Sequence, residues 1–250
     1  MMGRLGEDLK IILTAAVAVA MLIGLGIWQL DRLGQKRAQL AAQEARLGEP
    51  PAPVEDLLDL TAQELEFLPA LASGTWVGDL EFHQLTTRRG AAGWQIVRPL
   101  QLADSDVIFV NQGFVPHKQK MPDTRAAAET GAPAAVSGVL RQLVSKAPDR
   151  YLPENDLEKN VWYWLSFEQM AASLPSPQAA RPLVLIANPQ SSVEGGPQGR
   201  VIKPVDTSRH LSYALTWFGL ALAMIGVAYF SIRHRRRMTR LAEEAARRGG

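Results

Sequence analysis

The sequence predicts an α+β membrane protein in which two transmembrane helices flank a β-rich exported domain. Residues 11–28 and 211–232 form two apolar segments without a formal charge. At about 1.5 Å rise per residue, each helix would cross most or all of a hydrocarbon core of roughly 30 Å. Between the two segments, short stretches rich in β-branched and aromatic residues alternate with Gly, Pro, Asp and Asn, which is the pattern of strands and turns.

The first apolar segment is interpreted as an uncleaved membrane anchor. Ala18-Val19-Ala20 resembles the cleavage site of a signal peptide, but the apolar run continues well past it to Trp28. Helical periodicity then extends beyond the membrane until a Gly- and Pro-rich stretch at residues 48–53 stops it. The predicted organisation is a cytoplasmic N-terminus at 1–10, a first span at 11–30, a juxtamembrane helix and linker at 31–68, a β-rich periplasmic domain at 69–209, a second span at 210–232 and a basic cytoplasmic tail at 233–250.

The basic residues lie at the membrane flanks, while the formal net charge is only +2. Such residues mark the cytoplasmic side of a span. The cluster that follows the second span comprises Arg233, Arg235, Arg236, Arg237 and Arg240. We therefore expect both termini in the cytoplasm and the central domain in the periplasm of a bacterial inner membrane, although Arg32, Lys36 and Arg37 oppose this orientation locally. Membrane lipid is an expected partner, and nucleic acid is not.

The exported domain is predicted to be a small barrel or sandwich. A helix is expected at residues 54–67, where Thr61 and Glu64 have the spacing of a capping box, and a short one at 167–174. The predicted strands are residues 72–82, 93–102, 106–115, 135–143, 161–167 and 181–187, with 200–205 as a weaker candidate.

Small residues recur at helical spacing in both spans, which predicts that the two helices pack together. They are Ala16, Ala20 and Gly24 in the first span and Gly219, Ala223 and Gly226 in the second. The alternative is that Ala and Gly are simply common in membrane helices.

Composition and missing motifs exclude several functions. The chain contains no cysteine, so it can form no disulfide, no thiolate metal site and no Cys-x-x-Cys-His haem attachment. A copper(I) chaperone is disfavoured because such proteins rely on soft sulfur ligands. We expect no enzyme activity, because no G-x-S-x-G, H-E-x-x-H, Walker or Rossmann pattern occurs. The tail after the second span is too short for the output domain of a sensor.

His210 stands at the start of the second apolar segment. Tyr213 and Trp217 follow at i+3 and i+7, so the three side chains share one face of a helix. The other histidines offer no comparable arrangement. His83 and His117 are expected to be solvated surface residues without ligand spacing, and His234 belongs to the basic cluster.

Several short motifs follow one another along the chain: residues 26–32 (GIWQLDR) followed by Lys36, 74–76 (GTW), 93–94 (GW) with 98–100 (RPL), 110–116 (VNQGFVP), 137–141 (SGVLR), 160–163 (NVWY) and 210–217 (HLSYALTW). In this order they resemble the motifs of the surfeit-locus (SURF) family of cytochrome c oxidase assembly proteins, bacterial type. The sequence departs from the family pattern at Gln112, where arginine is usual, at Phe114, where tryptophan is usual, and at Ser208, where asparagine is usual.

The resemblance implies an assembly factor that assists the binding of haem a and its insertion into subunit I of a haem-copper cytochrome c oxidase. It implies subunit I as a partner, with haem a synthase as a further candidate, and transient binding of haem a. The alternative is a cofactor-free membrane scaffold that stabilises the nascent subunit.

Under this interpretation, His210 is the metal ligand, because haem iron accepts a neutral imidazole in an apolar slot. Tyr213 and Trp217 would line the slot, and Trp28 would pack against the porphyrin. Arg32, with Lys36 one turn further on, would meet the propionates. The competing interpretation makes the histidine an interfacial polar residue, the aromatics part of the belt at the membrane surface, and the basic residues snorkelling side chains.

Overall fold

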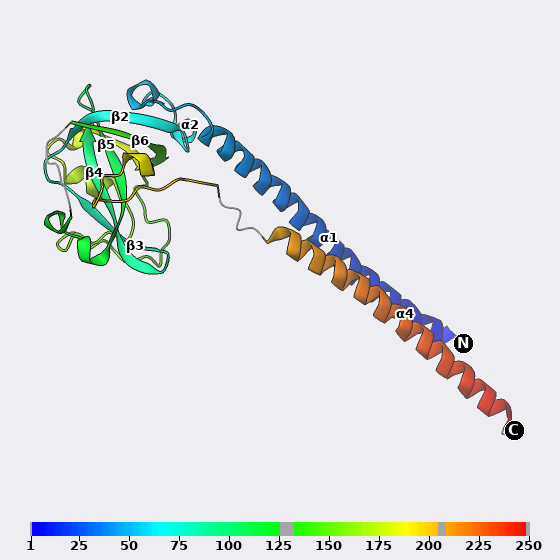
Figure 1. The fold of residues 1–250 in the computed structure, drawn as a ribbon. Helices are drawn as coiled ribbons and strands as arrows, with labels where there is room; N and C mark the ends of the chain where they lie inside the picture. Colours follow the sequence, from blue (N-terminus) through cyan, green and yellow to red (C-terminus); the bar gives the residue numbers. More distant parts are fainter. Residues whose placement is uncertain (1, 126–132, 205–208, 249–250) are drawn as a thin grey trace. The chain divides into compact units, whose positions relative to one another are not determined.

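The computed structural model describes residues 2–125, 133–204 and 209–248, without the side chains of residues 2–7, 133, 243 and 246. The chain divides into two compact units (Figure 1). One unit contains the two long helices, and the other is the β-rich domain, Ala42–Pro204.

The helical unit consists of α1 (Met2–Leu47) and α4 (His210–Arg248). Each helix contains a window that is apolar enough and long enough to cross a membrane, and only 6% of each window is buried inside the structure. Large apolar side chains that face outward along both helices are suited to lipid rather than to water. The fold is therefore that of a membrane protein with two spans around a β-rich domain, as predicted. Helix α1 ends at Leu47, directly before the Gly- and Pro-rich stretch.

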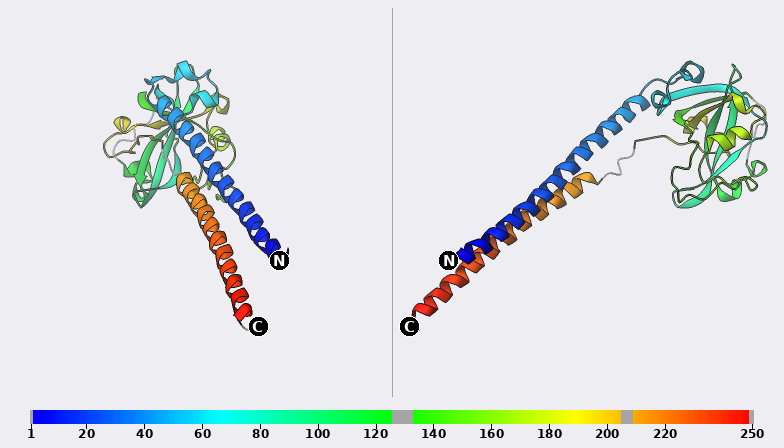
Figure 2. Two further views of the ribbon diagram at one scale, coloured as in Figure 1. Left: turned by 90° about the vertical axis from the view of Figure 1, so that its right-hand side faces the viewer. Right: turned by 180° about the vertical axis from the view of Figure 1, so that it is seen from behind.

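The two helices lie side by side and run in opposite directions (Figure 2). Gln29 contacts His210 near one end of the pair, and Asp8 contacts Arg236 near the other. Ala214 and Ala221, two turns apart on α4, are buried, and so is Gly26 on α1. A Cβ atom at Gly26 would overlap the ring of Phe218.

The prediction that the helices pack together is confirmed, but the predicted contact residues are wrong. Ala16, Ala20 and Ala223 are exposed, and no atom lies within 4 Å of a Cβ built on Gly24 or Gly219. The same open space surrounds Gly226. The interface follows a repeat of about seven residues that passes through Ala214 and Ala221, whereas the predicted residues, spaced mainly four apart, lie on neighbouring faces.

The β-rich domain is built on one seven-stranded sheet with the order β1-β2-β6-β7-β5-β4-β3. A second pairing, between the end of β2 and the end of β4, closes part of the sheet into a barrel-like form. The strands are β1 (Ala52–Pro53), β2 (Pro69–Trp76), β3 (Phe82–Arg88), β4 (Ala91–Gln101), β5 (Val107–Pro116), β6 (Pro133–Gln142) and β7 (Ala180–Ala187). The short helices are η1 (Val54–Leu57), α2 (Ala62–Leu65), η2 (His117–Gln119), η3 (Pro122–Thr124), α3 (Phe167–Ala172), η4 (Pro177–Ala179) and η5 (Pro189–Ser191).

Strand β5 is buried on both faces and separates two apolar clusters. Successive side chains of a strand point to opposite sides, so Ile108 and Phe109 enter different clusters. Ile108 packs among side chains of β2, β4, β6 and β7. Phe109 meets Phe82 edge-on, and Phe82 in turn meets Trp162, which comes from the irregular segment before α3. The sheet is thus covered on its second face by non-strand residues.

Most of the predicted secondary structure is confirmed. Strands at 93–102, 106–115, 135–143 and 181–187 correspond to β4, β5, β6 and β7, and the helix at 167–174 corresponds to α3. Thr61 and Glu64 form the predicted capping box at α2.

Four predictions need correction. Residues 72–82 are not one strand: β2 ends at Trp76, a turn with Gly78 at φ +57° follows, and β3 begins at Phe82. Residues 161–167 form only isolated bridges before α3 begins at Phe167, because their aromatic side chains cover the sheet instead of joining it. The helix predicted at 54–67 is split into η1 and α2. Residues 200–204 form no strand, and Val205 lies outside the described residues.

We expect Gly26→Ile to weaken the helix pair, because the added side chain must displace the ring of Phe218. Overpacking of this kind costs about 1–3 kcal/mol. The measurement is the midpoint of SDS-induced unfolding of the detergent-solubilised protein, followed by circular dichroism. Gly24→Ile is the matched control, because its side chain meets open space. Equal midpoints for the two variants would contradict the observed interface.

Candidate functional site

His210 is the first residue of α4, and its imidazole reaches across to α1. The Nδ1 atom lies 2.8 Å from the side-chain carbonyl oxygen Oε1 of Gln29. A carbonyl oxygen can only accept a hydrogen bond, so Nδ1 must carry the proton. In the neutral imidazole the lone pair is then on Nε2, which has no partner in the part of the chain that the structure describes. The contact therefore leaves Nε2 as the nitrogen of His210 without a hydrogen bond to the described residues.

The two aromatic residues that follow His210 differ in their surroundings. Tyr213 is 52% exposed. Trp217 is half-buried, and its indole Nε1 is buried with no hydrogen-bond partner among the described residues. A buried donor without an acceptor is unusual in native proteins, and it marks a place where a further group can be accommodated.

Trp28 and Arg32 lie on α1, on either side of Gln29 along the helix. Trp28 is 50% exposed, and the Arg32 guanidinium lies 5.9 Å from the centre of its ring, in a cation–π arrangement. Arg32 also donates a 2.9 Å hydrogen bond to Gln35 Oε1. Lys36 is half-buried.

The structure therefore forms two adjacent pairs, His210 with Gln29 and Trp28 with Arg32. Among the described residues, no hydrogen bond or ring contact joins the second pair to Tyr213 or Trp217. Gln29 was not among the site residues predicted from the sequence. It belongs to the motif at 26–32, but nothing in the sequence shows that it meets a histidine 181 positions away.

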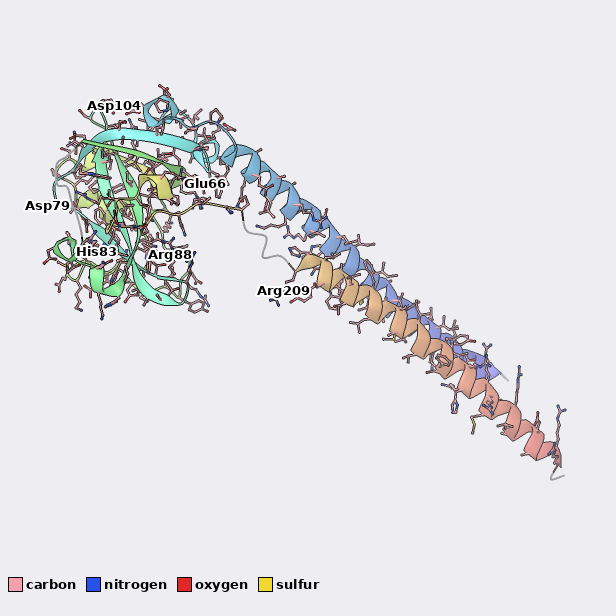
Figure 3. All side chains as sticks on the ribbon, in the orientation of Figure 1. Glu66, Asp79, His83, Arg88, Asp104 and Arg209 are labelled. Carbon is pink, nitrogen blue, oxygen red and sulfur yellow. The ribbon has the colours of Figure 1, made fainter. Side chains whose placement is uncertain are left out.

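A second polar centre lies inside the β-rich domain, where His83 corrects the prediction of a solvated residue (Figure 3). His83 is only 4% exposed, and its Nε2 lies 2.9 Å from Glu81 Oε2. Arg125 donates to both carboxylate oxygens of Glu81, at 2.5 and 3.3 Å. His117 is exposed, as predicted.

Asn160 connects this centre to the rest of the domain. Its side-chain oxygen accepts hydrogen bonds from the His83 backbone N–H at 3.2 Å and from the Trp162 indole N–H at 2.8 Å. Its side-chain nitrogen donates to the Glu81 carbonyl at 2.8 Å. Asn160 adopts φ +50°, a conformation that asparagine tolerates better than most residues. Three hydrogen bonds of the Asn160 side chain thus connect the backbone at Glu81 and His83 to the indole of Trp162.

The electrostatics of Glu81 are those of a structural ion pair. Burial alone would raise the pKa of its carboxyl group, but hydrogen bonds from His83 and Arg125, together with their charges, set the pKa below the ordinary value. Glu81 is therefore a carboxylate at neutral pH, with the Arg125 guanidinium as its counter-ion. No group of three or more His, Asp or Glu side chains among the described residues is arranged to hold a metal ion.

These features define a two-span membrane protein with an imidazole poised at one end of its helix pair and a β-rich domain that pairs its own buried charges. The chain belongs to the SURF1 family, whose sequence model matches residues 16–222. That range contains every site residue predicted from the sequence, and Gln29 and Glu81 as well. The family name implies a role in the assembly of cytochrome c oxidase.

Individual relatives match over most of the chain. The SURF1-like protein of Monosiga brevicollis is 31% identical over 221 residues, which cover 83% of this chain and 82% of the relative. Surfeit locus protein 1 of Homo sapiens is 31% identical over 218 residues, 80% of this chain and 70% of the human protein. A bacterial relative, the SURF1-like protein of Rickettsia felis, is 26% identical over 227 residues, 87% of this chain and 94% of the relative.

We expect Glu81→Gln to destabilise the β-rich domain by about 3 kcal/mol at neutral pH, because Arg125 loses its counter-ion inside the domain. A carboxyl with a depressed pKa contributes stability above its unfolded pKa, here near 4.5, and loses it as the pH falls through the lower folded value. The difference between wild type and variant should therefore shrink below about pH 4.5. Thermal unfolding followed by near-UV circular dichroism measures it.

Glu158→Gln is the matched control for this prediction, because Glu158 is exposed. It should change stability by no more than about 0.5 kcal/mol. A Glu81→Gln variant as stable as this control would show that the ion pair does not support the domain.

Proposed function

We propose that this protein is an assembly factor for haem-copper cytochrome c oxidase that assists the binding of haem a and its insertion into subunit I. The proposal rests on one observation, the hydrogen bond between His210 Nδ1 and Gln29 Oε1. Gln29 holds the proton on Nδ1, and this leaves the Nε2 lone pair available to an iron atom.

The residues present fit haem a. The bound group would supply an iron that accepts an axial imidazole, carried on a large apolar macrocycle. His210 offers that imidazole, and Gln29 acts as the second residue that fixes its tautomer and orientation, as is usual for metal-bound histidines. Tyr213 and Trp28 present exposed aromatic surface, and the unpaired indole N–H of Trp217 is free to meet a polar substituent.

Arg32 is placed to recognise carboxylates such as haem propionates. Its guanidinium is held over the Trp28 ring and bonded to Gln35, which restrains a side chain that would otherwise lose entropy on binding. Lys36 follows one turn later on the same face and adds a second positive charge.

A carrier must also release its cargo. The sequence contains four histidines, of which His83 is buried in the β-rich domain, His117 is exposed there, and His234 lies near the other end of α4. Within the helical unit, His210 is thus the one described imidazole at this end of the helix pair. A single imidazole from this unit and half-exposed aromatic side chains favour transient binding over permanent retention.

The proposal includes a location. The arginine cluster at the end of the second span favours cytoplasmic termini and a periplasmic β-rich domain. Together with the bacterial relative, this supports the inner membrane of a bacterium. Subunit I, haem a synthase and membrane lipid are the proposed partners. We propose no turnover of a substrate.

A cofactor-free scaffold for nascent subunit I is the second candidate. The observation in its favour is the exposure of large apolar side chains in the segment of the β-rich domain between β6 and α3. Tyr151 there is 77% exposed, and Leu157 is 53% exposed. Such side chains suit contact with a partner protein. A bound chromophore distinguishes the two candidates.

We expect the detergent-purified protein, co-expressed with a haem a synthesis pathway, to show the visible spectrum of haem a. His210→Ala should lose or shift this spectrum, because it removes the axial nitrogen. His234→Ala is the control and should retain the spectrum. A colourless wild-type protein from cells shown to contain haem a would reject the carrier and leave the scaffold.

We expect Gln29→Leu to weaken haem a affinity on the order of tenfold to a hundredfold, because the size of the side chain is kept and the hydrogen bond to Nδ1 is lost. The absorption maximum should also shift, since the imidazole becomes a poorer donor. Titration of the apoprotein with haem a measures both. The control is Gln39→Leu, at an exposed position on the same helix. Identical affinities and spectra for the two variants would remove Gln29 from the site.

A further inference from the structure

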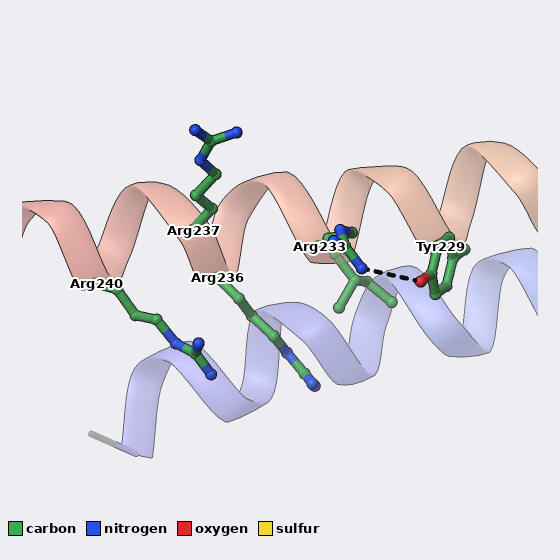
Figure 4. A pocket seen from close by; sticks show the side chains of 6 residues that line it. Tyr229, Arg233, Arg236, Arg237 and Arg240 are labelled. Carbon is green, nitrogen blue, oxygen red and sulfur yellow. Dashed lines mark hydrogen bonds between the residues drawn. The ribbon is translucent and has the colours of Figure 1, made fainter.

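A basic groove lies near the C-terminal end of α4, remote from His210 (Figure 4). It encloses about 590 Å³, and its described lining consists of Tyr229, Ile232, Arg233, Arg236, Arg237 and Arg240. We call it the arginine groove. It belongs to the helical unit and takes no part in the proposed haem site.

The four arginines are spaced i, i+3, i+4 and i+7, which places them along one side of the helix. Figure 4 shows that Arg236 and Arg240 extend toward α1, whereas Arg237 extends away from it. Arg233 donates a 3.3 Å hydrogen bond to the hydroxyl of Tyr229. The groove therefore has guanidinium groups along its length and a phenol at the end nearer the apolar segment.

Within the part of the chain that the structure describes, the positive charges of the groove are only partly balanced. Among the described side chains, the carboxylate that contacts it is Asp8, 3.3 Å from Arg236 Nε. Each guanidinium carries five N–H donors, so this carboxylate and the Tyr229 hydroxyl use a small part of the donors available. Four like charges on two helical turns repel one another unless an anion lies between them.

We propose that the arginine groove binds the headgroup of an anionic phospholipid, with phosphate oxygens on the guanidinium groups. The groove starts where the apolar segment of α4 ends, and lipid phosphates are the anions present at that depth of a bilayer. Arginine binds phosphate through two parallel N–H···O bonds, which gives directional recognition in addition to charge. Tyr229 and Ile232 provide the less polar end that the glycerol and upper acyl chains require.

The length of the groove favours a lipid with two phosphates. At about 1.5 Å rise per residue, Arg233 and Arg240 are about 10 Å apart along the helix axis. A single phosphate can satisfy only part of the guanidinium groups along this length, whereas cardiolipin carries two phosphates joined by a glycerol. The bound lipid would also neutralise the repulsion between arginines beside the Asp8 contact that joins α4 to α1.

Lipid binding to the full-length, delipidated protein tests the proposal, by native mass spectrometry and by titration with nanodiscs of phosphatidylcholine alone or with phosphatidylglycerol or cardiolipin. We expect cardiolipin to bind most tightly, then phosphatidylglycerol, then phosphatidylcholine, and inorganic phosphate to compete weakly. Equal binding of all three lipids would overturn the proposal. Effective competition by millimolar inorganic phosphate would also overturn it, since the site would then serve a soluble anion.

The variant Arg233→Gln/Arg236→Gln/Arg240→Gln separates the groove from the general basic charge of the tail. A basic residue beside an anionic bilayer strengthens binding by about fivefold, so the loss should be on the order of a hundredfold. The control Arg235→Gln/Arg247→Gln/Arg248→Gln removes the same charge from outside the groove lining and should lose at least tenfold less. Equal losses would show diffuse attraction and refute a defined site.

A charge-preserving variant covers the case in which the Gln variant folds or inserts incorrectly. Arg233→Lys/Arg236→Lys/Arg240→Lys keeps the topogenic charge but lacks the planar fork. It should lose most of the preference for cardiolipin over phosphatidylglycerol while keeping the helical content of wild type. An unchanged preference would contradict phosphate recognition by these arginines.

Discussion

The helical unit depends on one constraint: a polar side chain between two membrane helices must find a partner within the protein. An unpaired polar group in an apolar medium costs several kcal/mol, so the contact between His210 Nδ1 and Gln29 strongly favours one register of α4 on α1. Gly26, less than one turn from Gln29, then receives the ring of Phe218. The polar contact selects the register, and the glycine permits the close approach that the register requires.

The two units differ in how far their polar and charged side chains are paired within the protein. Inside the β-rich domain, the Glu81 carboxylate is saturated by His83 and Arg125, and Asn160 fixes the surrounding backbone. Such a network stabilises and specifies a fold, although His83 Nδ1 is buried without a hydrogen-bond partner among the described residues. At the ends of the helix pair, some hydrogen-bond donors and acceptors have no partner among the described residues. His210 keeps a lone pair, and the arginines near the other end keep N–H groups. The groups proposed here to bind ligands therefore lie on the helices.

Local patterns predicted the parts of the fold that local forces determine. Strands β4 and β5 were found because they are long, apolar and bounded by turn residues. Strand β3 was missed because polar side chains dominate it after its first residue, and it is ordered by pairing with β4. The environment of His83 depends on Arg125, which is 44 positions from Glu81, and no spacing rule reaches that far. Gln29 was missed as a site residue for the same reason, since its partner lies 181 positions away.

The failed small-residue prediction shows why the sequence located the helix pair but not its interface. Spacing of four identifies faces on which helices can approach closely, and both α1 and α4 carry such faces. Which face is used depends on the polar contact, because rotating α4 to bury Gly219 would turn His210 away from Gln29. An imidazole without a hydrogen-bond partner is costly, which favours the face that pairs His210 with Gln29. A residue proposed to bind haem iron thus also determines which helix faces meet, so the site and the packing of the spans are specified by the same interaction.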